Sequence, residues 1–448
     1  MVNTLPEACT AASRAPAPGG EVPHPVSVVI FHPSVGPPDQ QAARALHEAG
    51  QLDRFVTTVR DDPSSAVQRL AAAAARLAGR DLAARFRRRA VTEVPFDKVE
   101  THPWGELLRL AVGALDRDGR PTDFVWEHAE VDFDRRVARG LHASLTGVYG
   151  YEHSSRFTFE RARSLGIKVA YEVPAPERRF MQRIVNAEMD RFPELRTAYH
   201  RYTAKREDRR IARRLAEWHC ADVVIAASAF TKRSFSSVGL DVGKVEIVPL
   251  GAPVPAPRDQ ALRTGEATGA PLTFLWAGTF GIAKGAHYLL EAWRDGGFGR
   301  HARLKVFGTV ALPDRVLRPL PDGVELGGSI SRAELMAHYG SSDALIFPTL
   351  SDGWGMVVTE AWSRGLPVIM TDCAGAADLL RNGENGLLIR AADPRAIAES
   401  LDWCLAHPGE LRAMRGAALA TAQNWQWSDY RRRLTDVLRR SGLLAPTA

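Results

Sequence analysis

Short apolar runs bounded by turn residues recur along most of this chain, and segments with apolar positions at helical spacing separate them. Continuous apolar runs of this kind are typical of strands that are buried on both faces of a parallel sheet. An alternation of such strands with helices predicts a doubly wound α/β architecture. Because crossovers between parallel strands are right-handed, the carboxyl ends of the strands should lie along one edge of each sheet.

The first half of the chain shows this alternation in a looser form. Val26–Phe31 is a predicted buried strand, and a helix is expected over residues 40–49, ending at Gly50. The other predicted strands are Phe124–His128, the segment around Val148–Tyr151, Lys168–Tyr171, Val223–Ala227 and Val245–Val248. The other predicted helices are Ser64–Arg89, Phe159–Ser164 and Arg178–Cys220, the last with one break near Pro193.

The second half shows the alternation clearly, after a segment over residues 249–271 whose Pro, Gly and Ala content is typical of a linker. The predicted strands are Thr273–Ala277, Leu304–Phe307, Ala344–Phe347, Val368–Met370 and Leu387–Ile389. The predicted helices are Gly285–Trp293, Arg332–Tyr339, Met356–Arg364 and Pro394–Ala406.

These patterns predict two facing Rossmann-like doubly wound domains, residues 26–253 and 254–424, with a cleft between them. Residues 1–25 are rich in Ala, Pro and Gly and lack the basic start and apolar core of a secretory signal, so we expect a disordered tail. Residues 425–448 carry apolar positions at helical spacing and should form a helix that packs back on the N-terminal domain.

Composition excludes several classes of protein. The 448 residues are 45% hydrophobic and 25% charged, the balance of a soluble globular protein. No apolar run approaches the ~20 residues that span a bilayer. The four scattered cysteines form no CxxC pair, which argues for a reducing, cytoplasmic location and against a structural zinc site.

The net charge is +6, and the basic residues are concentrated in two segments, residues 80–89 and 201–214. Solvated helix faces account for such runs. The alternative is contact with an acidic acceptor or with an anionic membrane, which would make the protein peripheral at the inner membrane face. Neither run shows the regularly interleaved aromatic residues of a nucleic-acid-binding surface, so a nucleic-acid partner is not expected.

The most informative stretch, Phe347–Ile369, reads as strand, glycine-rich loop, helix, turn and strand. Gly353 and Gly355 would let a ligand approach the backbone, and the first amides of the helix favour an anion. Asp352 lies at the start of the loop and Glu360 within the helix. A diphosphate held by amides between two carboxylates that bind hydroxyls is what a nucleotide-sugar site needs. The alternative is an ordinary helix cap and a surface acid.

A second loop follows the first strand of the C-terminal half. Trp276–Lys284 ends a strand and brings Lys284 to the start of the next helix, just before Gly285. A lysine in that place can neutralise a phosphate as a point charge. The alternative is a solvated lysine after a turn.

In the first domain, His153 follows an apolar run and would face the cleft from the end of a strand. Glu152 is a rival for the same role, and a partly buried structural histidine is the alternative. The triplet Asp132-Phe-Asp134 resembles a metal-binding DxD motif, but Arg135, Arg136 and Arg139 follow at helical spacing. Ion pairing on a helix is therefore favoured over a metal ion.

Several segments together resemble the retaining family-4 glycosyltransferases (glycosyl transferases group 1), which have the two-Rossmann-domain GT-B architecture. The segments are 277–285, 324–330, 344–348, 352–360, 366–369 and 382–388, and the resemblance covers essentially residues 223–406. In the first domain it rests more loosely on the Gly36 loop, on Ser228 and on Pro249–Gly251.

The resemblance implies transfer of a hexosyl group from a nucleotide-diphosphate sugar, such as a UDP- or GDP-sugar, to an acceptor hydroxyl with retention of configuration. It implies no metal and no cofactor beyond this co-substrate. Residues 254–424 would bind the donor and residues 26–253 the acceptor, which is a glycan, a lipid-linked sugar or a small molecule.

Site roles also follow from the resemblance. Glu360 would bind the ribose hydroxyls, Lys284 the diphosphate, and Asp352 the donor sugar; Ile330 would lie by the nucleobase. The catalytic set would be Asp352, Lys284 and His153, with Gly36 and Glu152 on the acceptor side. The remaining donor-binding positions would be Gly278, Thr279, Gly353, Trp354, Gly355, Met356 and Val357.

Three departures from the family pattern bear on activity. The first motif acid is Asp352 rather than Glu, Thr279 and Phe280 stand where an arginine is usual, and His153 lacks a standard context. A nucleotide-sugar epimerase of the same fold and a catalytically weak, non-enzymatic homologue are therefore alternatives. A phosphorylase is disfavoured, because it would need a pyridoxal lysine and a much longer chain.

Overall fold

The computed structural model describes residues 27–62, 64–77, 86–87, 89–116, 118–262 and 270–446. The predicted disordered tail, residues 1–25, lies outside these ranges, as do most of the basic run 80–89 and part of the predicted linker.

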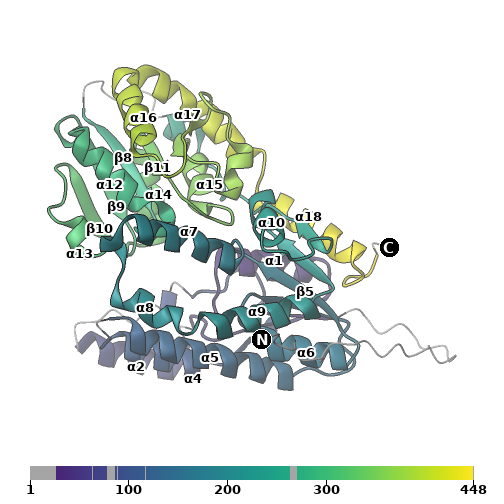
Figure 1. The fold of residues 1–448 in the computed structure, drawn as a ribbon. Coiled ribbons are helices and arrows are strands. Elements are labelled where there is room, and N and C mark those ends of the chain that lie inside the picture. Colours follow the sequence, from purple (N-terminus) through teal and green to yellow (C-terminus); the bar gives the residue numbers. More distant parts are fainter. Residues whose placement is uncertain are drawn as a thin grey trace. The chain divides into compact units, whose positions relative to one another are not determined.

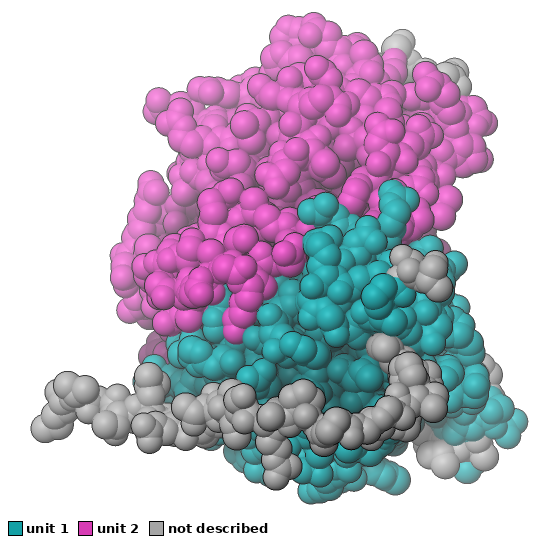
Figure 2. Space-filling model, turned by 90° about the vertical axis from the view of Figure 1, so that its right-hand side faces the viewer, with its two compact units in different colours: residues 1–173, 205–225, 431–448 teal, residues 174–204, 226–430 magenta. Residues whose placement is uncertain are grey.

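The chain forms two compact units, coloured separately in Figure 2. The first comprises residues 1–173, 205–225 and 431–448. The second comprises residues 174–204 and 226–430, so it includes segments that precede the predicted linker.

A seven-stranded sheet has the order β3-β2-β1-β4-β5-β6-β7, and its described strand pairings are parallel. The strands are β1 (Val28–Phe31), β2 (Leu52–Thr57), β3 (Val99–Thr101), β4 (Gly147–Tyr151), β5 (Lys168–Val173), β6 (Val223–Ala226) and β7 (Val245–Ile247). β2 and β3 were not predicted, because β2 contains Asp53 and Arg54 and β3 is only three residues long.

Among the described residues, seven α-helices and one 3₁₀ helix lie wholly or mostly in the first unit. They are α1 (Pro37–Glu48), α2 (Ala66–Leu77), η1 (Phe96–Lys98), α4 (Trp104–Gly113), α5 (Arg120–Arg139), α6 (Arg156–Ser164), α9 (Glu207–Cys220) and α18 (Trp427–Arg440). Figure 1 labels these seven α-helices. In α18 the four apolar residues at helical spacing, Tyr430, Leu434, Val437 and Leu438, are fully buried.

The strand predicted at Phe124–His128 is wrong, because these residues lie inside α5. A short run with aromatic and β-branched residues has no periodicity that separates a strand from a helix. Pro121 in the first turn of α5 signals a helix start instead, since its missing N–H has no partner there. Phe124 is half exposed, so the apolar run reflects no buried strand.

The sequence pattern favoured a solvated helix face for the basic run 201–214. The structure shows that part of this run is buried instead. Arg210 is buried and donates to Asp123 at 2.6 Å and to Glu127 at 3.1 Å. Arg213 is also buried and donates to Asp134 at 2.5 Å. Buried arginines with carboxylate partners hold α9 against α5, so this part of the charge is structural.

A second sheet has six parallel strands in the order β10-β9-β8-β11-β12-β13. They are β8 (Leu272–Ala277), β9 (Ala302–Phe307), β10 (Val324–Gly328), β11 (Ala344–Phe347), β12 (Val368–Met370) and β13 (Gly386–Leu388). The strands predicted in this half are confirmed. β10 was missed because it carries two glycines and is largely exposed beyond Val324.

The other described helices of the second unit are α7 (Arg178–Arg191), η2 (Pro193–Leu195), α8 (Ala198–Ala204), α10 (Ala229–Ser236), α11 (Arg258–Leu262), η3 (Ile282–Lys284), α12 (Ala286–Asp295), η4 (Phe298–Arg300), α13 (Asp314–Leu317), α14 (Arg332–Ser341), α15 (Met356–Ser363), η5 (Gly375–Leu379), α16 (Pro394–Ala406) and α17 (Pro408–Gln423). The long helical segment therefore breaks a second time, between α8 and α9. Within the described residues, no helix has both the length and the apolar character of a membrane span.

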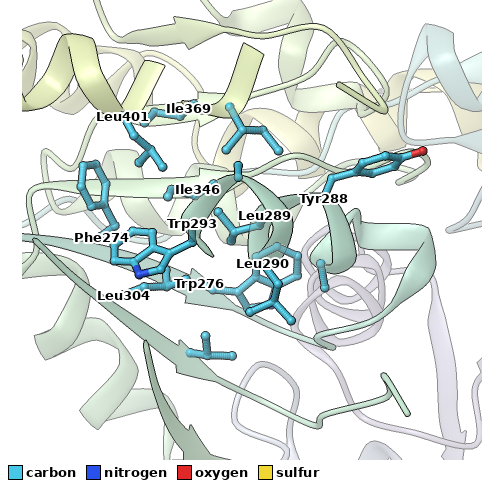
Figure 3. Packing of buried hydrophobic residues seen from close by; sticks show 14 of the residues in the cluster. Phe274, Trp276, Tyr288, Leu289, Leu290, Trp293, Leu304, Ile346, Ile369 and Leu401 are labelled. Atoms are coloured by element: carbon cyan, nitrogen blue, oxygen red, sulfur yellow. The ribbon is translucent and has the colours of Figure 1, made fainter. Parts of the chain in front are cut away.

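The core of the second unit fixes the strands that carry the predicted loops (Figure 3). Side chains of β8, β11 and β12 pack with those of α12, and each fully buried one contributes about 1.5–3 kcal/mol. The members drawn and labelled are Phe274, Trp276, Tyr288, Leu289, Leu290, Trp293, Leu304, Ile346, Ile369 and Leu401, each at most 1% exposed. This packing anchors the loop between β8 and α12 at both ends.

The first unit places ionisable side chains with raised pKa values at the carboxyl ends of β1 and β5. Glu172 is 3% exposed and accepts a hydrogen bond of 2.5 Å from the hydroxyl of Tyr149. Burial raises the pKa of Glu172 to about 7. Burial lowers the pKa of His32, but Asp39, at 3.0 Å, outweighs it, so that this pKa is about 9.

We expect Glu172→Gln to flatten part of the pH dependence of unfolding. Because the pKa of Glu172 is raised in the native state, the native state keeps a proton that the unfolded state has already released. The contribution of Glu172 to the free energy of unfolding is therefore fully present below the ordinary pKa of a glutamate, and about 3 kcal/mol of it is lost as the pH rises through 7. Glutamine keeps the shape and stays neutral, so the variant should lose less stability than the wild type between pH 5 and pH 8. Urea unfolding at the two pH values measures this, and equal losses would contradict it.

Candidate functional site

The two predicted loops lie at the point where the strand order of the second sheet reverses, between β8 and β11. In open α/β sheets, ligands bind outside the carboxyl ends of the strands at this switch point. The loops contact each other directly, since the amide of Leu350 donates to the carbonyl of Ala283 at 2.9 Å. A Cβ on Gly285 would lie 2.1 Å from the carbonyl oxygen of Pro348, so only glycine allows this approach.

Lys284 ends η3 and reaches across to the second loop. Its Nζ donates to Asp352 Oδ2 at 2.6 Å and to the carbonyl of Ser351 at 3.0 Å. The side chains of Lys284 and Asp352 are 26% and 22% exposed, so both are accessible at the surface of the unit. The structure thus brings together the ammonium group and the first motif acid, which the sequence placed in separate loops.

The loop after β11 is held by a hydrogen bond within the loop and by hydrogen bonds from the start of α10 and from η5. Asp352 Oδ1 accepts from the amide of Trp354 at 3.0 Å. The carbonyl of Gly353 accepts from the hydroxyls of Ser228, at 2.7 Å, and Thr231, at 3.1 Å, both buried near the start of α10. The amide of Ala376 donates to the carbonyl of Trp354 at 2.7 Å. The loop therefore has a fixed backbone before any ligand binds.

α15 begins directly after this loop. Gly355 takes a left-handed conformation, with φ of 87°, which glycine adopts without strain. Met356 and Val357, half-buried, form the first turn, where the amides and the helix dipole favour an anion. Trp354, by contrast, is buried, so it contributes its backbone and packing rather than an exposed ring.

Glu360 lies one turn into α15 and is only 7% exposed. Its Oε1 is 2.9 Å from a guanidinium nitrogen of Arg332, and its Oε2 accepts from the hydroxyl of Tyr339 at 3.2 Å. Burial raises the pKa of Glu360, and Arg332 and Tyr339 oppose that rise.

The remaining predicted donor positions also follow strands of this sheet. Gly278 and Thr279 come directly after β8 and are exposed, and Gly278 has a φ of 101°. Ile330 is half-buried and follows β10. A lysine, a fixed glycine loop, a helix start and a buried acid are thus all positioned at one edge of one sheet.

Residues 271–407, which include Lys284, Asp352 and Glu360, match the protein family described as glycosyl transferases group 1. This match assigns residues 271–407, which are less than half of the chain, to the glycosyl transferases group 1 family. The match covers the whole second sheet.

Two curated relatives are named as glycosyltransferases. A D-inositol 3-phosphate glycosyltransferase of Xylanimonas cellulosilytica is 26% identical over 218 residues, which cover 44% of this chain and 52% of that protein. One of Rhodococcus jostii is 35% identical over 89 residues, 20% of each chain. The chain thus spans about half or less of the length of these relatives.

Solved structures with similar folds extend over nearly the whole chain. The sucrose-phosphate synthase of Thermosynechococcus elongatus superposes with a TM-score of 0.62 at 17% identity, covering 93% of this chain and 98% of that one. The Anabaena HepE protein in complex with UDP-glucose gives a TM-score of 0.57 at 15% identity, covering 92% and 99%. Together with the two parallel sheets, this likeness confirms the predicted GT-B architecture of two Rossmann-like folds.

Outside the group 1 match, the candidate acceptor-side residues lie in the first unit. His153 follows β4 as predicted, but it is 3% exposed and stacks on Trp126 with ring centroids 4.7 Å apart. Its amide donates to Glu217 at 2.7 Å and its carbonyl accepts from Arg213 at 2.5 Å. These contacts fit the alternative of a structural histidine, and a catalytic role for His153 stays a prediction.

The two other acceptor-side candidates have structural partners as well. Glu152 pairs with Arg214 at 2.9 Å. Gly36 precedes α1, and its amide donates to Asp39 at 2.8 Å. Both lie after strands β4 and β1, which flank the switch point of the first sheet.

The two acids of the DxD triplet have separate partners. Asp132 pairs with Arg136 at 2.7 Å on the surface of α5, which confirms the predicted helical ion pair. Asp134 is fully buried and accepts from the amides of Phe157 and Thr158 at the start of α6.

Arg332 and Tyr339, the partners of Glu360 in the group 1 domain, were missed. The helix that carries them was predicted, and their separation by two helical turns places them on one face. The segment Ser331-Arg-Ala-Glu334 is also a capping-box pattern, which marks Arg332 as the first residue of the helix. What the sequence lacked was the packing of this helix against α15.

Proposed function

We propose that this protein is a retaining glycosyltransferase that transfers a hexosyl group from a nucleotide-diphosphate sugar to an acceptor hydroxyl. The single observation that carries the proposal is the meeting of Lys284 with the loop 352–355 at the switch point of the second sheet. Family membership over residues 271–407 supports it. The HepE structure contains UDP-glucose, which supports a UDP-sugar as the donor class.

In the proposed mechanism, the bond between the anomeric carbon and the diphosphate oxygen breaks, and a bond to the acceptor oxygen forms on the same face. The acceptor proton passes to the leaving phosphate. Negative charge builds on the diphosphate as it departs, and Lys284 together with the amides at the start of α15 stabilises it. This front-face scheme needs no metal ion and no separate general base.

Other residues of the second unit would orient the donor. Glu360 would accept hydrogen bonds from the ribose hydroxyls, Ile330 would lie beside the base, and Asp352 would contact the sugar once Lys284 turns to the phosphates. Gly278 and Thr279 would approach the diphosphate from the loop after β8, and the amides of residues 353–357 would face it from the other loop.

The acceptor is proposed to bind to the first unit, near Gly36 and Glu152, with His153 as the catalytic candidate. A glycan, a lipid-linked sugar and a small molecule are the candidate classes. The names of the curated relatives add D-inositol 3-phosphate, a phosphorylated polyol, to the acceptors worth assaying. Contact of exposed arginines with an anionic membrane stays a prediction.

The first experiment is calorimetry with UDP-, GDP- and ADP-glucose. We expect one of them to bind, and Glu360→Ala to weaken its binding about 10- to 100-fold, because the ribose loses a charged hydrogen-bond acceptor. If no nucleotide sugar binds, the non-enzymatic alternative is favoured. Unchanged affinity in the variant would contradict the role given to Glu360.

A product assay separates the transferase from the epimerase. With donor alone, the transferase should release little sugar, whereas adding an acceptor should yield a glycoside with the donor's anomeric configuration. Steady release of sugar without any acceptor would favour the epimerase.

A further inference from the structure

Glu360 is held by two side chains of a single helix. Arg332 and Tyr339, both from α14, bind Oε1 at 2.9 Å and Oε2 at 3.2 Å. Each carboxylate oxygen can accept two hydrogen bonds, so one position on each oxygen remains for a ligand hydroxyl. Two adjacent hydroxyl groups, such as those of a ribose, match this pair of remaining positions.

The two partners differ in what they leave accessible. Tyr339 is fully buried, whereas the side chain of Arg332 is 47% exposed. The backbone of Arg332 is fixed, because the hydroxyl of Ser331 accepts from the amide of Glu334 and the carboxylate of Glu334 accepts from the amide of Ser331. The guanidinium group of Arg332 extends from this held position to Glu360.

We propose that Arg332 is a positioning residue for nucleotide recognition, which holds Glu360 charged and oriented so that its carboxylate accepts the 2′- and 3′-hydroxyls of the donor ribose. This inference rests on the proposed function, in which Glu360 binds that ribose. It concerns how the acid is prepared for the nucleotide rather than the transfer step itself.

The electrostatics of the site agree with this role. Burial raises the pKa of Glu360, and the groups that oppose the rise are Arg332 and Tyr339. α17 also packs on α15, but its buried Arg415 donates to the main-chain carbonyls of Ser342, Gly340 and Arg364. Loss of the Arg332 charge should therefore raise the pKa of Glu360 further, and a protonated carboxyl is a poorer acceptor for two hydroxyls.

The test uses the full-length protein with UDP and 2′-deoxy-UDP, titrated calorimetrically at pH 5.5, 6.5 and 8. If GDP or ADP binds more tightly than UDP, its ribo and deoxy forms replace the uridine pair. The wild type should prefer the ribonucleotide about tenfold at pH 8. In Arg332→Gln this preference should shrink, and it should fall more steeply than in the wild type as the pH is lowered. Arg332→Lys, which keeps the charge, should recover part of it.

Arg294→Gln, on the exposed face of α12, is the matched control and should behave as the wild type. Equal weakening of both nucleotides in Arg332→Gln, with no pH effect, would overturn the inference and indicate a merely structural arginine. A wild-type preference profile in the variant would also overturn it and leave the proposed function intact. Failure of the wild type itself to bind any of the nucleotides would refute the proposed function and this inference together.

Discussion

Replacing Lys284 by methionine should weaken binding of the nucleotide-diphosphate sugar by about 100-fold and lower turnover by a factor of about 10² to 10³. Methionine keeps the length and apolar stem of lysine but removes the only charge that this loop brings to the site. Thr279 and Phe280 stand where the family usually has an arginine, so Lys284 has no second cation in that loop to replace it.

The effect on turnover should exceed the effect on ground-state binding. Lys284 pairs with Asp352 before the donor binds. When the donor binds, Lys284 exchanges its contact with the Asp352 carboxylate for a contact with the diphosphate, so the net gain in binding is reduced. In the transition state the leaving diphosphate carries additional negative charge. The ammonium group stabilises this charge, and no further contact of Lys284 has to be given up for it.

Calorimetry and a single-turnover assay of product formation measure the two effects separately. Lys305→Met, a half-buried lysine on β9, is the control for loss of one positive charge in the same unit. Lys305→Met should keep wild-type affinity and rate. If Lys284→Met also kept both, the anion site would have to lie elsewhere.

Gly353→Ala should also be strongly damaging, although it adds a single methyl group. The new Cβ would lie 2.0 Å from the carbonyl oxygen of Pro174 and 3.2 Å from Cα of Ala175. Both neighbours are main-chain atoms that cannot swing away, so the loop 352–355 must shift. Overpacking of this kind costs about 1–3 kcal/mol in the free energy of unfolding.

The shift should also impair the site. Moving Gly353 would break the hydrogen bonds that its carbonyl accepts from Ser228 and Thr231, and would displace Asp352 and the start of α15. Displacement of about 1 Å in a positioning loop can lower activity 100-fold. We therefore expect donor affinity to fall even at temperatures where the variant remains folded.

Gly340→Ala supplies the matched control, because a Cβ at Gly340 in α14 meets nothing within 4 Å. Alanine in an unobstructed helical position is favoured over glycine by up to about 1 kcal/mol, so this variant should be as stable as the wild type or more so. Urea unfolding and donor titration of both variants check the prediction. Equal behaviour of the two would show that the loop tolerates the methyl group.

Local signals were sufficient for most of the second sheet. Apolar runs between turn residues predicted Ala344–Phe347 and Val368–Met370 with their observed bounds, and the helix Pro394–Ala406 was also predicted with its observed bounds. The same signals failed for Phe124–His128, where helix and strand patterns coincide over a short run. Periodicity needs about ten residues before it separates the two structures.

The candidate site divides in a similar way. The glycines and the spacing indicated that Lys284, Asp352 and Glu360 follow or lie near strand ends, and parallel strands put those ends on one edge. The partners of these residues were not predictable. Arg332 was an unremarked helix residue, and His153 was expected to face a cleft but stacks on Trp126.

The sequence by itself determined the alternation of strands and helices, the glycine loops and the identity of the charged groups, because these depend on residues close together in the chain. Only the tertiary structure decided which groups meet: Lys284 with Asp352, 68 positions apart, and Ser228 with the carbonyl of Gly353, 125 apart. Such contacts depend on strand order and on helix packing, which arise from burial of the whole core and have no local signature.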